Sequence, residues 1–184
     1  VLEPVDVYNI LRKMPAKMSM GPDFIPSCVL MQCAISLALP LSILYNASLS
    51  SGIVPSAWKH AHVVPIFKKG EHAEPSNYRP VSLISGLGKG LEDPVHHEVL
   101  AHCTRQKLIS NEQFVFLPGR STTGQLIDCF DLITKALDDG CCVDVVYLDL
   151  SKAFDTISVR KLLLKLESLG ISSQLLSWFR SYLS

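Results

Sequence analysis

Three features that would point directly to a function are absent from this sequence. Its 17 basic and 17 acidic residues leave no net charge, so it lacks the strong positive charge of many nucleic-acid-binding domains. None of its six cysteines forms a Cys-x-x-Cys pair, and its six histidines follow no zinc-ligand spacing. No basic start followed by a short apolar run marks a signal peptide. The composition predicts an intracellular globular protein with reduced thiols.

Charged side chains are also absent from one long stretch, residues 24–58. The part from 28 to 47 is apolar enough to be considered as a membrane span. Proline and polar residues interrupt it, however, and no basic flank marks a cytoplasmic side. We therefore predict two buried helices here, 25–38 and 40–51, with Gly52 closing the second.

Hydrophobic periodicity predicts the remaining elements. Further helices are expected at residues 7–14, 87–107 and 122–139, after Ser158, and from 172 onward. Short β-branched runs predict strands at 61–67 and 79–84 with an exposed loop between them, and a third strand at 143–150. The third run is nearly all apolar, which is typical of a central strand buried on both faces. This order of elements predicts an α+β fold.

Asp149 stands at the end of the predicted central strand, where a side chain emerges at the rim of a sheet. A carboxylate in apolar surroundings is unfavourable unless it is paired or binds a cation. A lone aspartate there is also a common turn or helix-capping residue, which is how we interpret Asp155. Asp144 is expected on the opposite strand face. A phospho-aspartate enzyme would need a second Asp where this chain has Ser151.

The nine residues from Tyr147 to Asp155 resemble the first palm motif of the reverse transcriptases of non-LTR (LINE-type) retrotransposons. Four earlier segments resemble other motifs of that family, in the family's order. They are Gly21-Pro22-Asp23 with Ile25-Pro26, the first fingers strand from Trp58-Lys59 to Gly70, the second from Asn77 to Leu83, and Gln113-Phe114 with Phe116 and Gly119 to Thr122. Five ordered motifs are far more specific than one.

The resemblance implies the fingers and partial palm of a right-hand polymerase. Residues 1–120 would be the fingers-like region, and 121–184 the start of the palm, truncated before the Asp-Asp hairpin of the family. The parent activity would be RNA-directed DNA synthesis from an RNA template, a DNA primer and dNTPs. Two Mg²⁺ ions would serve the nucleotidyl transfer in the intact parent enzyme.

The resemblance also implies roles for six residues. Asp149 would be the catalytic carboxylate that binds both metal ions, and Leu150 would add a backbone carbonyl. Lys68 or Lys69, with Arg79, would reach the triphosphate, and Arg suits bidentate phosphate contact best. Phe154 would stand under the sugar and exclude a 2′-hydroxyl. The ordinary interpretations are a charged, solubilising hairpin end for the lysines and a core aromatic for Phe154.

The sequence also departs from the family. It contains no Pro-Gln-Gly segment and no aromatic-x-Asp-Asp motif. Its only Asp-Asp, Asp138-Asp139, precedes Asp149 and is expected to be a solvated helix end. Phe24 and Val115 replace usual glycines, and they would be strained if those glycines serve positive φ.

The chain begins without Met and stops within an apolar stretch, so we expect a fragment that is inactive alone. Two alternatives stay open: a non-catalytic retroelement relic that at most binds nucleic acid, and an interaction module without a nucleic-acid role.

Overall fold

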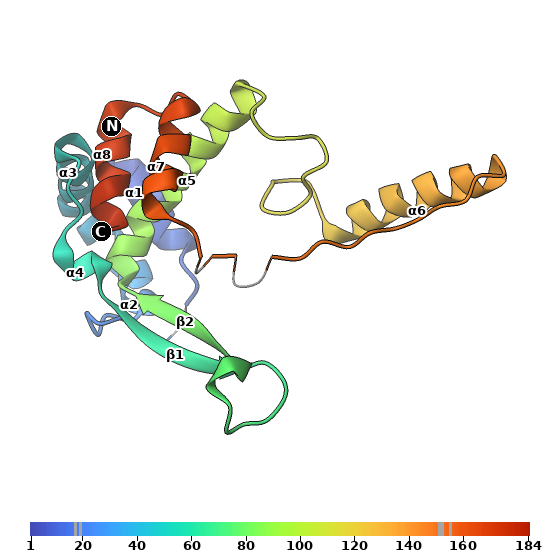
Figure 1. Ribbon diagram of the computed structural model, residues 1–184. Coiled ribbons are helices and arrows are strands. Elements are labelled where there is room, and N and C mark those ends of the chain that lie inside the picture. The colour runs from blue at the N-terminus through green and yellow to red at the C-terminus, as the bar shows by residue number, and fades with distance from the viewer. Residues whose placement is uncertain (17, 19, 151–152, 155) are drawn as a thin grey trace. The chain divides into compact units, whose positions relative to one another are not determined.

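The computed structural model describes residues 1–16, 18, 20–150, 153–154 and 156–184. In this part of the chain the protein is mostly helical and has one small two-stranded sheet (Figure 1). The expected α+β fold is therefore present in a strongly helical form. Packing divides the chain into two compact units, Val1–Ala101 with Val159–Ser184, and His102–Ser158.

The first unit contains most of the helices. They are α1 (Pro4–Lys13), α2 (Ser27–Gln32), α3 (Ala34–Ser51), α4 (Ser56–Lys59), α7 (Val159–Ser168), α8 (Ser173–Tyr182) and the greater part of α5 (Gly86–Arg105). The first of these begins with a capping box, in which Glu3 and Asp6 each bond the other's backbone N–H. The helices expected near 7–14 and 87–107, after Ser158 and from 172 are confirmed.

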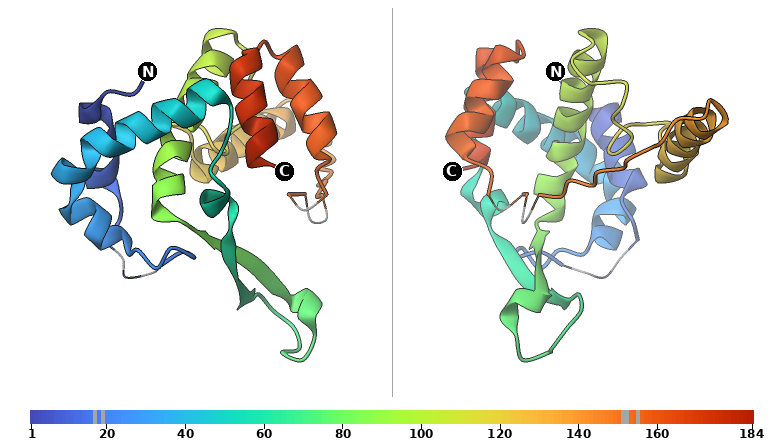
Figure 2. Two further views of the ribbon diagram at one scale, coloured as in Figure 1. Left: turned by 90° about the vertical axis from the view of Figure 1, so that its left-hand side faces the viewer. Right: turned by 45° about the vertical axis from the view of Figure 1, so that its right-hand side comes forward.

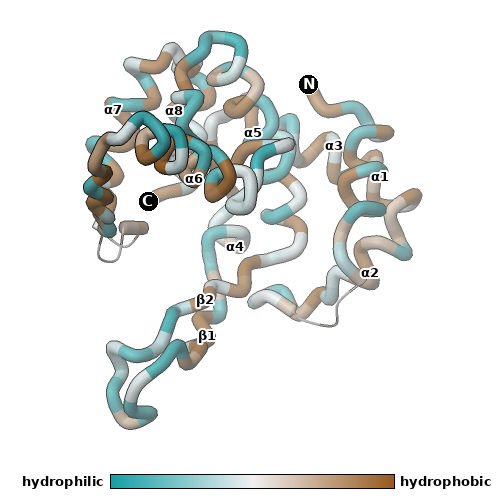
Figure 3. Tube along the Cα trace, turned by 90° about the vertical axis from the view of Figure 1, so that its right-hand side faces the viewer, coloured by the Kyte–Doolittle hydropathy of each residue, from teal (hydrophilic) through white to brown (hydrophobic). Residues whose placement is uncertain are grey.

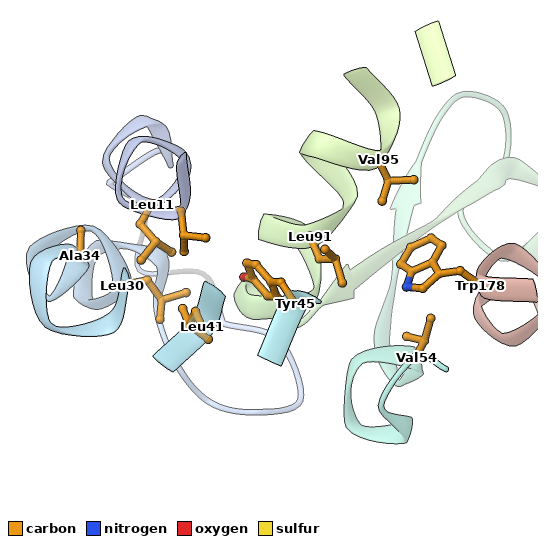
Figure 4. Close-up of a cluster of buried hydrophobic side chains, with 10 residues drawn as sticks. Leu11, Leu30, Ala34, Leu41, Tyr45, Val54, Leu91, Val95 and Trp178 are labelled. Atoms are coloured by element: carbon orange, nitrogen blue, oxygen red, sulfur yellow. The ribbon is translucent and has the colours of Figure 1, made fainter. Parts of the chain in front are cut away.

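The core of this unit forms where α1, α3, α5 and α8 meet (Figure 4). Tyr45 of α3 is fully buried, and its hydroxyl donates to the Leu87 carbonyl at 2.7 Å. Trp178 of α8 is 2% exposed, and its indole N–H donates to the Ser48 hydroxyl at 3.1 Å. Each large aromatic therefore enters the core with its polar atom satisfied, which keeps its burial favourable.

Residues 25–51 of the uncharged stretch form two helices, as predicted, but the boundary between these helices is not at Pro40. The break lies at Cys33, and Pro40 is inside α3. Proline removes one hydrogen bond of the helix, but Leu41 and Tyr45 just beyond it are buried in the core and stabilise its continuation. By length and composition α3 is apolar enough to cross a membrane. Its buried residues pack on α1 and α8, so we interpret it as a core helix.

Two antiparallel strands, β1 (Ala61–Phe67) and β2 (Tyr78–Ile84), form the sheet. The pairing runs from Ala61 with Ile84 at the base to Phe67 with Tyr78 at the far end. The hairpin extends away from the helices of its own unit (Figures 1 and 2), and the middle of both strands is exposed. Its far end is largely hydrophilic (Figure 3). Both predicted strands and the exposed loop between them are confirmed.

The second unit contains α6 (Thr122–Asp138), as predicted. Ser121 caps this helix by accepting a hydrogen bond from the Gly124 N–H at 3.0 Å. No residue of α6 is buried, although hydrophobic residues such as Leu126, Ile127 and Phe130 recur along it; the colours of Figure 3 mark their hydropathy.

The expected buried strand at 143–150 is wrong. These residues form no helix or strand and are all exposed. A strand needs a neighbour to bond its backbone groups, and no described residue pairs with this segment.

Candidate functional site

The far end of the β1–β2 hairpin gathers the three cations that the sequence analysis selected. Ile66 pairs with Arg79 in the sheet, which places Arg79 at the last-but-one rung. Lys68 and Lys69 follow β1 directly, and the Lys68 N–H donates to the Asn77 carbonyl at 2.9 Å. All three side chains are exposed, and none has an ion-pair partner among the described residues. The hairpin therefore presents three free cations at one end.

An aromatic cluster stabilises this end of the hairpin. The His72 ring stacks on Phe67 with centroids 3.8 Å apart, and Tyr78 meets Phe67 edge to face at 5.5 Å. The Tyr78 hydroxyl also donates to the His72 carbonyl at 2.9 Å. These contacts fold the loop back on the strands, so the lysines stand on an ordered turn. The sequence did not reveal this cluster, because His72 alone carries no recognisable signal.

The proposed catalytic residues lie in the second unit. Asp149 is exposed in the segment without regular structure, and Leu150 beside it is 80% exposed. Phe154 is also 80% exposed, so the interpretation as a core aromatic is wrong for the described structure. Exposure alone assigns no ligand, so the roles of Asp149, Leu150 and Phe154 stay predictions.

A metal site is not complete within the described residues. No three His, Cys, Asp or Glu side chains among them come close enough to hold an ion. A two-metal site needs several carboxylates, and Asp149 offers one. The described donor set therefore does not by itself fit the pair of Mg²⁺ ions that the resemblance implies.

The Asp138-Asp139 pair lies at the C-terminal end of α6. Asp138 is the last residue of α6 and Asp139 is its C-cap, and both are exposed. The prediction that this Asp-Asp is a solvated helix end is confirmed. The turn expected at Asp155 lies outside the described residues.

The opening motif has a structural role that the sequence did not reveal. Gly21 packs directly on the end of β2, where a Cβ at position 21 would lie 2.5 Å from the Ile84 carbonyl oxygen. Asp23 Oδ2 accepts a hydrogen bond of 2.5 Å from the Ser85 hydroxyl, which is 1% exposed. Ser85 Oγ in turn accepts from the Leu87 N–H at 3.2 Å, at the start of α5. The motif therefore joins the hairpin base to this helix.

Backbone strain is expected at Phe24 and Val115, and the structure has a positive φ at one of these two positions. Phe24 has φ 56°, in the left-handed region that favours glycine, so the expected strain is confirmed there. Its ring is 70% exposed and meets His62 of β1 edge to face at 5.9 Å. At the second site the positive φ, 63°, belongs to Phe116 instead of Val115, so that prediction is wrong by one residue.

The motif before α6 is held together locally. The Arg120 guanidinium lies over the Phe114 ring, 5.0 Å from its centroid, and also donates to the Asn111 carbonyl. Gly119 has φ 74°, which the turn requires. The motif residues therefore form the turn that leads into Ser121 and α6.

Comparison with known proteins decides the family. The model of the reverse transcriptase (RNA-dependent DNA polymerase) family matches residues 66–184, which include the hairpin cations and Asp149. This chain belongs to the reverse transcriptase family. Members of the family in general use divalent metal ions and bind a nucleic-acid template and primer.

The similar proteins are reverse transcriptases of non-LTR retrotransposons. A probable RNA-directed DNA polymerase from transposon BS of Drosophila melanogaster is 31% identical over 85% of this chain and 18% of its own length. The RNA-directed DNA polymerase from mobile element jockey of Drosophila funebris is 28% identical over 96% of this chain and 19% of its own length. The chain thus spans less than a fifth of these relatives.

Proposed function

We propose that this chain forms the fingers, residues 1–120, and the first part of the palm, residues 121–184, of an RNA-directed DNA polymerase. It would act on an RNA template, a DNA primer and dNTPs. The observation that carries the proposal is the cationic end of the β1–β2 hairpin, which lies within the part of the chain that matches the family.

The hairpin end suits contact with a triphosphate. Lys68, Lys69 and Arg79 are exposed and have no described ion-pair partner, so no internal pair must be broken when phosphate binds. Arg79 offers a planar fork of donors, and the lysines offer compact charges. Glu71 and Glu74 share the loop, so the three cations keep this end of the hairpin positive by only one formal charge. We assign all three to the phosphates of the incoming nucleotide.

In the palm, Asp149 would supply one metal-binding carboxylate and Leu150 a backbone carbonyl. Phe154 would lie under the sugar. Support for these roles is the motif that contains them and their exposure, since an exposed side chain is free to contact a ligand. Because the described residues hold no cluster of metal ligands, we expect the 184-residue chain alone to extend no primer on RNA.

The proposal is tested by titrating the isotope-labelled chain with dTTP and following backbone amides by NMR. We expect the largest shifts at Lys68, Lys69 and Arg79. Binding should be roughly tenfold or more weaker in Arg79→Ala, because a charge-assisted hydrogen bond contributes about 1.5 to 3 kcal/mol. The matched control is Arg12→Ala on α1, which also removes an exposed arginine of the first unit. Equal affinity of both variants would contradict the proposal.

A further inference from the structure

Asn77 occupies the inside of the hairpin loop that carries the two lysines. Its side chain is half-buried, and Nδ2 donates to the Glu71 carbonyl at 3.0 Å. Its backbone closes the loop twice: the carbonyl accepts from the Lys68 N–H at 2.9 Å, and the N–H donates to the Glu74 carbonyl at 3.1 Å. Asn77 thus forms hydrogen bonds with Lys68, Glu71 and Glu74, at the start, middle and end of the loop.

Gly70 completes this arrangement from the other side. It has φ 95°, and a Cβ at position 70 would lie 2.5 Å from Asn77 Nδ2. The amide of Asn77 therefore packs directly against the backbone of the residue that follows Lys68-Lys69. Any side chain at position 70 would push the amide away and strain the turn.

We propose that Asn77 is a positioning residue for polyphosphate binding. It holds the turn from Lys68 to Gly70 in one conformation, so the lysines are already placed when a triphosphate arrives. A loop ordered in advance loses less conformational entropy on binding, and its affinity is correspondingly higher. This inference rests on the proposed phosphate contact of Lys68 and Lys69.

A positioning role differs from simple stabilisation of the hairpin. The seven residue pairs of β1 and β2 lie outside the loop, and the Phe67–His72–Tyr78 cluster also ties the loop to the strands. Loss of the Asn77 amide should therefore release the lysine turn and leave the strands paired. Loss of the Asn77 amide should therefore weaken dTTP binding only while Lys68 and Lys69 are present.

The test is a set of dTTP titrations on the full chain. Backbone amide exchange at Val64 and Val81, a hydrogen-bonded pair of the ladder, reports strand pairing. We expect Asn77→Ala and Gly70→Ala each to weaken dTTP binding roughly three- to tenfold with the strand amides still protected. Asn46→Ala is the matched control. It removes an amide that bridges the Leu2 backbone in both directions at 2.8 Å, and it should leave dTTP affinity unchanged.

The same substitutions are then made in a Lys68→Ala/Lys69→Ala background, where we expect less than about a twofold effect because the residues act through one network. An equal loss in both backgrounds would make Asn77 purely structural and overturn the inference. Wild-type affinity of Asn77→Ala and Gly70→Ala, with the lysine variant weakened, would overturn the inference and leave the proposed function standing. Unchanged affinity of the lysine variant itself would overturn both. Gly70→Ala disturbs the contact between Gly70 and the Asn77 amide but keeps Asn77 itself. Either variant therefore tests the inference if the other folds poorly.

Discussion

Asp23 and Ser85, 62 residues apart in the chain, share a hydrogen bond of 2.5 Å between Oδ2 and Oγ. Ser85 is almost fully buried, and its hydroxyl also accepts from backbone N–H groups at the start of α5. The contact explains why an Asp follows Gly21-Pro22 in a motif that lies far from Asp149 in the sequence. Its part in this protein is to fix the hairpin base to the helical core.

Removal of that hydroxyl should destabilise the first unit. We expect Ser85→Ala to lower the free energy of unfolding by about 1 to 3 kcal/mol, because Asp23 Oδ2 loses its donor and the Leu87 N–H loses its acceptor. Urea denaturation measures the change. Ser76→Ala is the control, since its hydroxyl donates to Glu74 on the exposed loop. A similar loss of unfolding free energy in the two variants would show that the Asp23–Ser85 hydrogen bond stabilises the fold no more than an exposed one.

The strained backbone at Phe24 gives a second prediction. With φ at 56°, Phe24→Gly should be more stable than Phe24→Ala by about 1 kcal/mol, because only glycine adopts this conformation without a steric penalty. Both substitutions remove the exposed ring and its contact with His62, so the difference between them isolates the backbone. Thermal and urea unfolding of Phe24→Gly and Phe24→Ala measure this difference in stability. Greater stability of the alanine variant would mean that the backbone there relaxes freely.

Tyr182 gives a prediction about alkaline pH. Burial raises its pKa well above the ordinary value of about 10, and a hydrogen bond to Glu92 and the charge of Glu92 raise it further. The folded state therefore favours the protonated phenol, and its contribution to stability is complete below pH 10 and is lost as pH rises further. We expect the free energy of unfolding to fall less steeply above pH 10 in Tyr182→Phe.

The control for this measurement is Tyr147→Phe, because Tyr147 is 89% exposed. It should keep the alkaline slope of the parent chain. Tyr45, whose pKa burial also raises, would account for part of the slope that remains in Tyr182→Phe. The same slope in all three proteins would show that the phenol of Tyr182 titrates as freely in the folded chain as in the unfolded one.

Local sequence signals predicted the elements that depend on local physics. Periodicity and turn residues located the helices and the hairpin, and Gly52 ends α3 with φ 67° as expected. The strand at 143–150 failed because strand formation depends on a neighbour, which a run of apolar residues cannot report. Pro40 misplaced a boundary because core packing of Leu41 and Tyr45 outweighs one lost hydrogen bond.

The candidate site also has a part that the sequence predicts and a part that it does not. Lys68, Lys69 and Arg79 could be selected from motifs, and the hairpin register then placed them at one end. The amide of Asn77 could not be connected with Gly70 from the sequence, because the contact depends on how the loop folds back. The Asp23–Ser85 bond is equally hidden, since neither residue type signals a partner 62 positions away.

The most direct test of the proposed function is primer extension on an RNA template by a polymerase that contains this segment together with an aromatic-x-Asp-Asp motif. Asp149→Asn keeps the size of the side chain and removes its charge, so we expect extension to fall by several orders of magnitude, on the order of 10³-fold or more. Asp144→Asn is the matched control, because Asp144 lies in the same exposed segment and undergoes the same chemical change. We expect near-parental extension from the Asp144 variant, and primer–template binding should persist in both. Equal extension by the two variants, with both folded, would contradict the assignment of Asp149 as the catalytic carboxylate.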